Sequence, residues 1–234
     1  MRKKRICVLT GAGISAESGI QTFRDADGLW EGHDIMEVAT PEGWNKNREL
    51  VLKFYNDRRR QLHDVKPNEG HLELIKLEEK YDTIIITQNV DNLHEVAGSK
   101  QIIHLHGELI KVRSEGDAED IYEWPGDLGS ADVATDGSSL RPHIVWFGEA
   151  VPELESAIQA IMSTDIIIII GTSMQVYPAA SLTSYSPKDA PIYYIDPKPT
   201  INHELSLQGD RLNIIQGTAA EKVKEVVELL LATS

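Results

Sequence analysis

The chain has 234 residues and carries 23 basic against 37 acidic side chains, which gives a formal net charge of −14. This charge argues against the phosphate backbone of nucleic acids as the main partner. The basic start MRKKR precedes too few apolar residues for a signal peptide, and the longest apolar run, Ile166–Ile170, is too short to cross a membrane. We therefore expect a soluble cytoplasmic protein with no nucleic-acid or membrane partner, and Cys7 as a buried structural thiol.

Short apolar runs predict buried β-strands, and most of them lack the alternation of a half-exposed strand. Continuous apolar character is typical of parallel strands that are covered on both faces. The runs are Ile6–Leu9, Thr83–Thr87, Ile102–Leu105, Ile144–Phe147, Ile166–Ile170, Ile192–Ile195 and Leu212–Ile215. Helical patterns alternate with several of them, at Glu69–Lys80, Pro152–Met162 and Thr218–Leu231, and the last begins with a capping box. The sequence therefore predicts an α/β fold with a Rossmann-like, doubly wound parallel sheet.

Two regions do not follow the pattern of the sheet. Residues 31–66 contain one helical pattern, Asn47–Leu62, and residues 108–142 are acidic, contain glycine and are weakly patterned. We expect a single catalytic domain over residues 1–234, in which these two regions form a smaller inserted helical and loop domain. The Rossmann-like core then comprises residues 1–30, 67–107 and 143–234.

A glycine-rich turn follows the first predicted strand. Gly11, Gly13 and Ala16 fit the pattern G-x-G-x-x-G/A, in which small residues let backbone N–H groups approach a pyrophosphate at a helix start. A dehydrogenase would show a second strand soon afterwards, ending in an acidic residue that holds the ribose, and this chain has none there. We expect a dinucleotide site that is not built for hydride transfer.

Polar residues stand where predicted strands end, which is where parallel sheets bind ligands. Gln88, Asn89 and Asp91 offer amide and carboxylate groups suited to ribose hydroxyls and to the carboxamide of nicotinamide. His106 stands at another strand end, with Gly107 leaving room beside it, and can take a proton from a hydroxyl near neutral pH.

Five motifs stand in one order along the chain: GAGISAESGIQTFR at 11–24, QNVDNLH at 88–94, HLHG at 104–107, HIVWFGE at 143–149 and GTS at 171–173. Together they resemble the sirtuin family, the NAD-dependent protein-lysine deacylases. The stretch FYNDRRRQL at 54–62 resembles the branch of the family that removes acidic acyl groups. The resemblance implies that the acyl group of a protein lysine is transferred to ADP-ribose, so that nicotinamide, deacylated lysine and O-acyl-ADP-ribose are formed.

The resemblance also implies roles for individual residues. His106 acts as the general base, Asn89 orients ribose and water, Asp91 holds nicotinamide, and Phe23 shields the reacting ribose. Cofactor contacts are expected from Gly11, Ala12, Gly13, Ser15, Glu17, Phe23, Arg24, Trp30, Gln88, Asn89, Val90, Asp91, Gly171, Thr172, Ser173, Asp196 and Ala219. Contacts with the acyl-lysine protein are expected from Tyr55, Arg58, Val145, Phe147, Gly148, Glu149 and Val176.

Tyr55 and Arg58 bear on the acyl specificity. The apolar stripe of the helical pattern Asn47–Leu62 includes both, whereas Arg59 and Arg60 are expected to point elsewhere. Residues at i and i+3 are neighbours, so the pair can bind one carboxylate, such as that of succinyl- or malonyl-lysine. A solvated arginine run or an internal salt bridge would account for Arg58 without such a substrate.

The insertion departs from the family pattern. Most sirtuins hold a structural zinc there with two pairs of cysteines, whereas residues 108–142 contain neither cysteine nor histidine. Thiolate zinc binding is excluded in this segment, so we expect NAD as cofactor and no zinc. His104 shares a strand face with His106, which could suggest a metal pair. We disfavour it because no third and fourth ligand stands nearby at the usual spacing.

Other functions stay open on the sequence alone. Mono-ADP-ribosyl transfer breaks the same bond of NAD, and a non-catalytic NAD-sensing module would have no need of His106. A zinc-dependent deacylase would need a ligand cluster that the sequence does not show. Asp196 can bind the adenosine ribose or merely open the turn at Pro197, and structural roles are expected for His71 and His94. The sequence defines neither the target proteins nor the oligomeric state.

Overall fold

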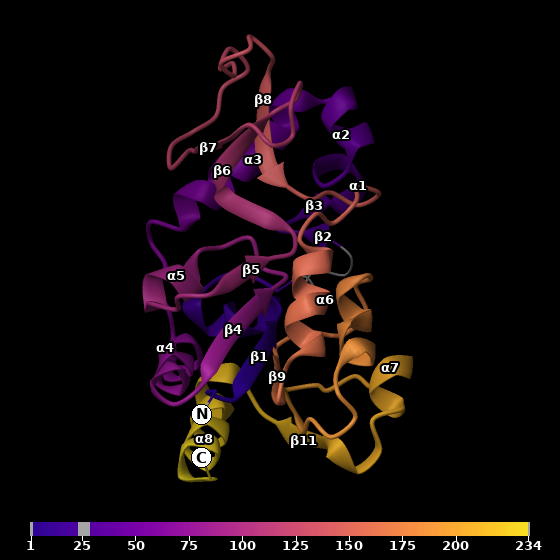
Figure 1. Ribbon diagram of the computed structural model, residues 1–234. Coiled ribbons are helices and arrows are strands. Elements are labelled where there is room, and N and C mark those ends of the chain that lie inside the picture. The colour runs from indigo at the N-terminus through magenta and orange to yellow at the C-terminus, as the bar shows by residue number, and fades with distance from the viewer. Residues whose placement is uncertain (1, 23–28, 234) are drawn as a thin grey trace.

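The computed structural model describes residues 2–22 and 29–233. Phe23 and Arg24, two of the expected cofactor contacts, lie outside the described residues. The chain forms two parts, a parallel sheet with its helices in the lower half of Figure 1 and a smaller part above it. The described chain begins and ends at the far end of the larger part, away from the smaller one (Figure 1).

The larger part is built on a six-stranded parallel sheet in the order β11-β10-β9-β1-β4-β5. The strands are β1 (Arg5–Thr10), β4 (Asp82–Thr87), β5 (Ile102–His104), β9 (Ile166–Ile170), β10 (Ile192–Asp196) and β11 (Leu212–Gln216). From β1 the chain continues to one side with β4 and β5, and later to the other side with β9. Thr10 pairs with both Thr87 and Ile170, so the carboxyl ends of these central strands lie level. The change of direction beside β1 marks the edge where such sheets bind ligands.

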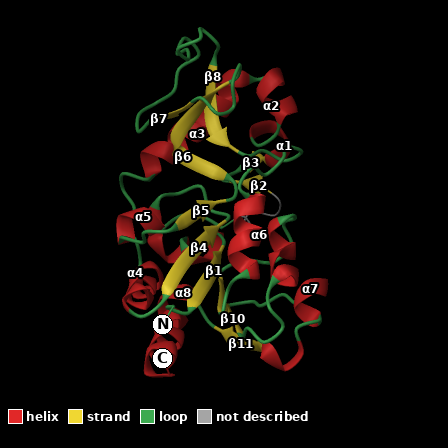
Figure 2. Ribbon diagram, in the orientation of Figure 1, coloured by secondary structure: helices red, strands yellow, loops and turns green. Residues whose placement is uncertain are grey.

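Helices cover both faces of this sheet (Figure 2). They are α4 (Glu69–Ile75), α5 (Leu93–Ala97), α6 (Leu154–Met162), α7 (His203–Ser206) and α8 (Ala219–Thr233), with the 3-10 helices η3 (Lys76–Glu79), η4 (Ala179–Tyr185) and η5 (Gly209–Arg211). Successive strand residues point to opposite faces, so Ile6 and Val8 pack with α4 and α8, while Cys7 and Leu9 pack with α6 and η4. Every residue of β9 is buried, which explains its run of isoleucine, since each buried side chain contributes about 1.5–3 kcal/mol.

The smaller part consists of a second sheet and three helices around one apolar core. Its strands β6 (Gly107–Ser114), β7 (Ile121–Glu123) and β8 (Leu140–Ile144) are antiparallel in the order β7-β6-β8, and β2 (Leu29–Trp30) pairs with β3 (His33–Asp34). The helices are α1 (Ile35–Val38), α2 (Pro41–Lys46) and α3 (Arg48–Gln61). Trp44, Tyr55 and Trp146 are among the large side chains that fill the core.

One expectation about this part is wrong and another is incomplete. Residues 108–142 lie mostly outside regular structure, as expected, but they also contain β7 and most of β6 and β8. Half-buried charged residues such as Lys111 and Arg113 interrupt the apolar pattern of β6, so a search for apolar runs does not find it. The strand expected at Ile144–Phe147 is instead β8, which ends at Ile144 and belongs to the antiparallel sheet.

Polar side chains of α3 hold the insertion in place. Asn56 donates to the Leu128 carbonyl and accepts from the Leu128 N–H, both at 2.9 Å. Arg59 is 1% exposed and donates to the Leu109 carbonyl at 2.7 Å. The expectation that Arg59 points away from the core is therefore wrong. It lies one helical turn beyond Tyr55, on the same face, and the Leu109 carbonyl and Asn56 Oδ1 accept two of its hydrogen bonds.

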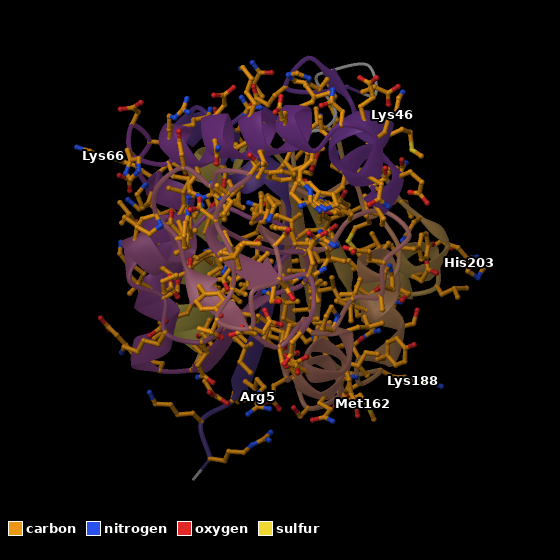
Figure 3. The ribbon with its side chains drawn as sticks, turned by 90° about the horizontal axis from the view of Figure 1, so that it is seen from above. Arg5, Lys46, Lys66, Met162, Lys188 and His203 are labelled. Atoms are coloured by element: carbon orange, nitrogen blue, oxygen red, sulfur yellow. The ribbon has the colours of Figure 1, made fainter. Side chains whose placement is uncertain are left out.

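Charged side chains lie around the outline of the molecule. Seen from above, Lys46, Lys66 and Lys188 extend outward from the ribbon (Figure 3). Within residues 2–22 and 29–233, no helix is both long and apolar enough to span a bilayer.

Candidate active site

Two glycine-containing turns meet at the carboxyl ends of β1 and β9. The Gly13 N–H donates to the Gly171 carbonyl at 2.8 Å, and a Cβ atom on Gly13 would lie 2.6 Å from Gly171 Cα. A larger residue at position 13 would therefore push the two turns apart. The chain continues as two short 3-10 helices, η1 (Ala12–Ile14) and η2 (Ala16–Ser18), in place of the long helix that follows such a turn in a dehydrogenase.

Ser15, Asn89 and Asp91 form a buried polar cluster behind this turn. The Ser15 hydroxyl donates to Asp91 Oδ2 at 3.0 Å and accepts from Asn89 Nδ2 at 3.1 Å. Asp91 Oδ1 accepts from the Leu93 N–H at 3.1 Å. Burial raises the pKa of Asp91, and the hydrogen bonds from Leu93 and Ser15 oppose this shift. The cluster offers both an amide and a carboxyl group to a polar ligand such as a carboxamide.

His106 follows β5 at the same edge of the sheet. Its Nδ1–H donates to the Gln88 carbonyl at 3.0 Å, which leaves Nε2 as an acceptor. Burial lowers the pKa of His106, and the bond to Gln88 offsets part of the shift. The imidazole is therefore neutral at neutral pH and can take a proton from a hydroxyl. Gly107 has a φ of 81°, and a Cβ there would lie 2.0 Å from the His143 carbonyl oxygen, so β8 can pass only beside a glycine.

His104 has a different set of partners. Its Nδ1–H donates to the Asn89 carbonyl at 3.2 Å, and its Nε2 lies 2.6 Å from Glu95 Oε1 and 3.9 Å from Glu108 Oε1. The sequence spacing indicated no third and fourth ligand near the two histidines, and the structure places these two carboxylates, from α5 and β6, beside His104. The group of potential ligands that the structure describes is Glu95, His104 and Glu108, and it does not include His106. The disfavoured His104–His106 pair thus has no geometric support among the described residues.

Gln88 and Thr172 connect the ends of β4 and β9. Gln88 Nε2 donates to Thr172 Oγ1 at 3.0 Å, and the same oxygen accepts from the Met174 N–H at 3.2 Å. The Thr172 carbonyl accepts from the Tyr194 hydroxyl at 2.8 Å. The segment Gly171–Ser173 is therefore fixed beside the glycine turn, with Ser173 half-buried at its end.

Glu17 links the glycine turn to the start of α8. Its carboxylate accepts from the Thr218 hydroxyl at 2.9 Å and from the Ala220 N–H at 2.8 Å. The capping box expected at Thr218 is only half formed, because Glu221 accepts from the Thr218 N–H at 3.3 Å while the Thr218 hydroxyl is bonded to Glu17. A negative charge at this helix start is favourable, and it holds Ala219 near η2.

The other expected cofactor residues lie in two environments. Asp196 is buried at the end of β10 and accepts from the Lys198 N–H at 2.8 Å, as in a turn that the aspartate opens. Trp30 and Val90 pack against the core of the smaller part, where the Trp30 ring lies 5.0 Å from that of Phe54. The structure brings together at the strand ends Gly11, Ala12, Gly13, Ser15, Gln88, Asn89, Asp91, His106, Gly171 and Thr172.

The segment 145–149 returns from β8 to the larger part beside His106. The Val145 N–H donates to the His106 carbonyl at 3.0 Å. Phe147 and Gly148 are exposed, with 46% of Phe147 accessible to solvent, and Val176 is half-buried. An exposed aromatic ring two residues beyond this bond suits the docking of a polypeptide.

Glu149 is bonded within its own loop. Its carboxylate accepts from Arg141 at 2.7 Å and from the Trp146 N–H at 2.8 Å, and Arg113 lies at 3.4 Å. Burial would raise the pKa of Glu149, but the bonds to Arg141 and Trp146 outweigh it and lower the pKa. Glu149 therefore fixes the loop rather than presenting a free charge.

Tyr55 and Arg58 lie on α3 in different surroundings. Tyr55 is fully buried, and its oxygen accepts from Trp146 Nε1–H at 2.9 Å. Burial raises the pKa of Tyr55, so the phenol keeps its proton. Arg58 is half-buried, with Cζ 4.8 Å from the centre of the Phe54 ring, and its Nε has no hydrogen-bond partner among the described residues.

Sequence reasoning missed three contributors to the site. His104 was considered only as a metal ligand, although the period-two spacing of the two histidines places both side chains at the same strand end. Arg141 and Trp146 anchor Glu149 and Tyr55, and the Arg141 Cζ lies 3.3 Å from the centre of the Trp146 ring. Arg141 stands in a weakly patterned segment, where the sequence carries no signal for it.

Fold and site together define a nucleotide-binding α/β protein with a neutral histidine beside a buried amide and carboxyl cluster. The Sir2 family matches residues 11–178, and the chain belongs to this family, as its motifs predict.

Relatives of known name are similar over almost all of their length. An NAD-dependent protein deacylase of Helicobacter pylori is 63% identical over 86% of this chain and 87% of the relative. One of Bacteroides thetaiotaomicron is 50% identical over 97% of this chain and 98% of the relative. The crystal structure of a Sir2 homologue in complex with NAD superposes with a TM-score of 0.85 at 37% identity, and covers 99% of this chain and 91% of that one. The predicted fold class is therefore confirmed.

Proposed function

We propose that this chain removes acyl groups from protein lysines in an NAD-dependent reaction that yields nicotinamide, deacylated lysine and O-acyl-ADP-ribose. The observation that carries the proposal is the neutral His106, bonded through Nδ1 to Gln88, next to the cluster of Ser15, Asn89 and Asp91. The family of the chain and the names of its relatives support the same reaction.

The residues at the strand ends fit NAD. Gly13 and Gly171 let the two turns pack directly against each other, and we place the pyrophosphate at the main chain of these turns. Asp91 and Asn89 match the donor and acceptor of a carboxamide. When bound, NAD would supply an anomeric carbon that the acyl carbonyl oxygen can attack as nicotinamide leaves, and with one water its ADP-ribose would take up the acyl group while the lysine amine is released.

Each residue of the site has a defined task in this scheme. Asp91 accepts an N–H of the carboxamide and so fixes the orientation of the leaving group. Asn89, whose amide is held by Ser15, orients the ribose. His106 Nε2 removes the proton of a ribose hydroxyl, which makes that oxygen a better nucleophile toward the acyl carbon. The lowered pKa keeps this nitrogen free of a proton at neutral pH.

We further propose that succinyl- and malonyl-lysine are good substrates. The Nε of the half-buried Arg58 has no hydrogen-bond partner among the described residues, and the carboxylate of an acidic acyl group would supply an acceptor for it. The Tyr55 oxygen already accepts from Trp146, so its own hydrogen remains for an acceptor. The exposed Phe147 would meet the polypeptide that carries the lysine. The proposed substrates are cytoplasmic proteins.

A panel of acetyl-, malonyl- and succinyl-lysine peptides, incubated with and without NAD, tests this function. We expect deacylation only with NAD, and mass spectrometry should detect O-acyl-ADP-ribose in equal amount to nicotinamide. ADP-ribosylated protein without deacylated lysine would favour mono-ADP-ribosyl transfer instead. Deacylation without NAD would contradict the proposal.

A further inference from the structure

Two histidines hold two adjacent peptide groups of the same loop. His104 Nδ1–H donates to the Asn89 carbonyl at 3.2 Å, and His106 Nδ1–H donates to the Gln88 carbonyl at 3.0 Å. Both rings leave the end of β5 on one side, because they are two residues apart. The bond from His106 orients the proposed base, whereas the bond from His104 to Asn89 has no role in the proposed function so far.

The second nitrogen distinguishes the two rings. His106 Nε2 is left as an acceptor, whereas His104 Nε2 lies 2.6 Å from Glu95 Oε1 and 3.9 Å from Glu108 Oε1. An oxygen acceptor on each side of the His104 ring favours a proton on both nitrogens. Only 8% of the His104 side chain is accessible, so little solvent competes for these bonds.

The charges around His104 agree with this state. Burial alone would lower the pKa of His104, but the hydrogen bond and the charge of Glu95, with help from Glu108, outweigh it and raise the pKa. The Lys111 ammonium group donates to Glu108 at 2.6 Å and partly neutralises the negative charge of this carboxylate. Asp91 and His94 also interact with the charge of His104. Burial raises the pKa of Asp91 and the charge of His104 opposes this shift, whereas burial lowers the pKa of His94 and the charge of His104 adds to the shift. Neighbouring histidines whose pKa values shift in opposite directions are suited to different tasks.

Asn89 is held at its main chain as well as its side chain. Its N–H donates to Thr87 Oγ1 at 3.0 Å, and its carbonyl accepts from His104. These two bonds fix the rotation of the residue, and the side-chain amide then reaches Ser15 Oγ at 3.1 Å. If the bond to the carbonyl is lost, the peptide is free to rotate, and the amide leaves its place. Misplacement of a group by ~1 Å can cost on the order of 100-fold in rate.

We propose that His104 is a positioning residue for Asn89: it fixes the Asn89 carbonyl through Nδ1–H, and Glu95 holds the ring in place through Nε2. The proposal rests on the proposed role of Asn89 in deacylation. His104 itself touches neither NAD nor the acyl-lysine in this scheme.

Two amide replacements test the two ring nitrogens of His104 one at a time. In His104→Asn, the amide nitrogen stands close to the former position of Nδ1 and can still donate to the Asn89 carbonyl. In His104→Gln, the amide nitrogen stands close to that of Nε2 and reaches Glu95 instead. We expect kcat of His104→Asn within about fivefold of the wild type and kcat of His104→Gln lower by about 10- to 100-fold. KM for NAD should change less than about threefold in both, and their melting temperatures should fall by similar amounts.

Glu95→Gln provides a second test that keeps the ring. Without the charge of Glu95, the pKa of His104 falls, and at higher pH the ring loses one proton. The remaining proton is then shared between the two nitrogens, and Nδ1 without hydrogen repels the carbonyl oxygen. We expect kcat relative to the wild type to fall several-fold at pH 8.5 and to recover at pH 6. A purely structural defect would lower kcat by the same factor at both pH values.

The outcomes distinguish this proposal from the proposed function. If the wild type shows no NAD-dependent deacylation, the function itself fails. If Asn89→Ala abolishes turnover but His104→Gln keeps it, His104 does not position Asn89. Equal losses in His104→Asn and His104→Gln, with a flat pH ratio in Glu95→Gln, would also overturn the proposal and leave His104 a structural residue.

Discussion

The hydroxyl of Ser15 donates to one carboxylate oxygen of Asp91 and accepts from the amide of Asn89, at 3.0 and 3.1 Å. One oxygen atom of the glycine turn thus joins the two side chains that we place next to nicotinamide. All three residues are buried, so the cluster has little room to rearrange when a ligand enters. We therefore expect the effect of a substitution in this cluster on kcat/KM for NAD to depend on whether it removes a charge or a hydrogen bond to that charge.

Asp91→Asn removes the charge and the acceptor while keeping the shape. We expect kcat/KM for NAD to fall by about 10- to 150-fold, since a hydrogen bond to a charged group contributes about 1.5–3 kcal/mol. Ser15→Ala keeps the carboxyl group of Asp91 but removes the hydrogen bond that the Ser15 hydroxyl donates to it, so we expect a loss of about 10-fold or more for this variant too. Steady-state kinetics at constant peptide concentration measures both. An unchanged kcat/KM in Asp91→Asn would remove Asp91 from the cofactor site.

His106→Ala should bind NAD and lose turnover. Loss of a general base lowers kcat by about 100-fold or more, whereas calorimetry should show a dissociation constant for NAD within a few-fold of the wild type. Near-normal turnover of the variant would rule out His106 as the base.

The pH dependence of the wild type follows from the same residue. The active form is neutral His106, and burial lowers its pKa below the usual value of about 6.5. As pH falls through this lowered pKa, the ring gains a proton and activity is lost. We therefore expect the acid limb of kcat/KM to have its midpoint below pH 6.5. A midpoint above pH 7 would contradict the neutral state of the buried ring.

Arg58→Met tests the acyl specificity, because it keeps the apolar stem and removes the charge. We expect activity on succinyl-lysine to fall by about 10- to 1000-fold, while activity on acetyl-lysine, which needs no cation, persists. Ratios of kcat/KM for the two peptides in one variant exclude general misfolding as the cause.

Arg59→Met is the matched control on the next position of α3. This side chain is buried and bonded to the Leu109 carbonyl and to Asn56, so its loss should lower the melting temperature and both activities together. If Arg58→Met behaves in the same way as Arg59→Met, Arg58 is structural and the proposed carboxylate contact fails.

We expect the purified protein to carry no stoichiometric zinc and to keep its activity in the presence of a chelator. Residues 108–142 contain no cysteine or histidine, and contacts such as that between Asn56 and Leu128 hold this insertion. Elemental analysis measures the metal, and about one tightly bound zinc per chain would overturn the expectation.

The parallel sheet could be predicted because burial on both faces leaves an unmistakable pattern. The predicted run Ile166–Ile170 has the same bounds as β9, and the predicted run Ile192–Ile195 ends one residue before β10 does. The smaller part could not be predicted in the same way. In β6 charged side chains lie on the open face, and β8 is followed by the apolar Val145–Phe147, which moved the expected strand toward the loop.

The sequence could predict which residues lie at the site, but not which side chains and backbone groups they contact. Motif order brought Ser15, Asn89 and His106 together, because each stands at the end of a strand of one sheet. Which of two neighbouring arginines is buried depends on where α3 meets the insertion, and no periodicity fixes that within one residue. For this reason Arg59 was misjudged.

The Val145 N–H donates to the carbonyl oxygen of His106, so the segment that we propose for substrate docking is bonded to the main chain of the residue that we propose as the base. A polypeptide that settles on the segment 145–149 presses directly on the main chain of the base, without any relay of side chains. Loosening this segment should therefore slow the chemical step as well as weaken peptide binding.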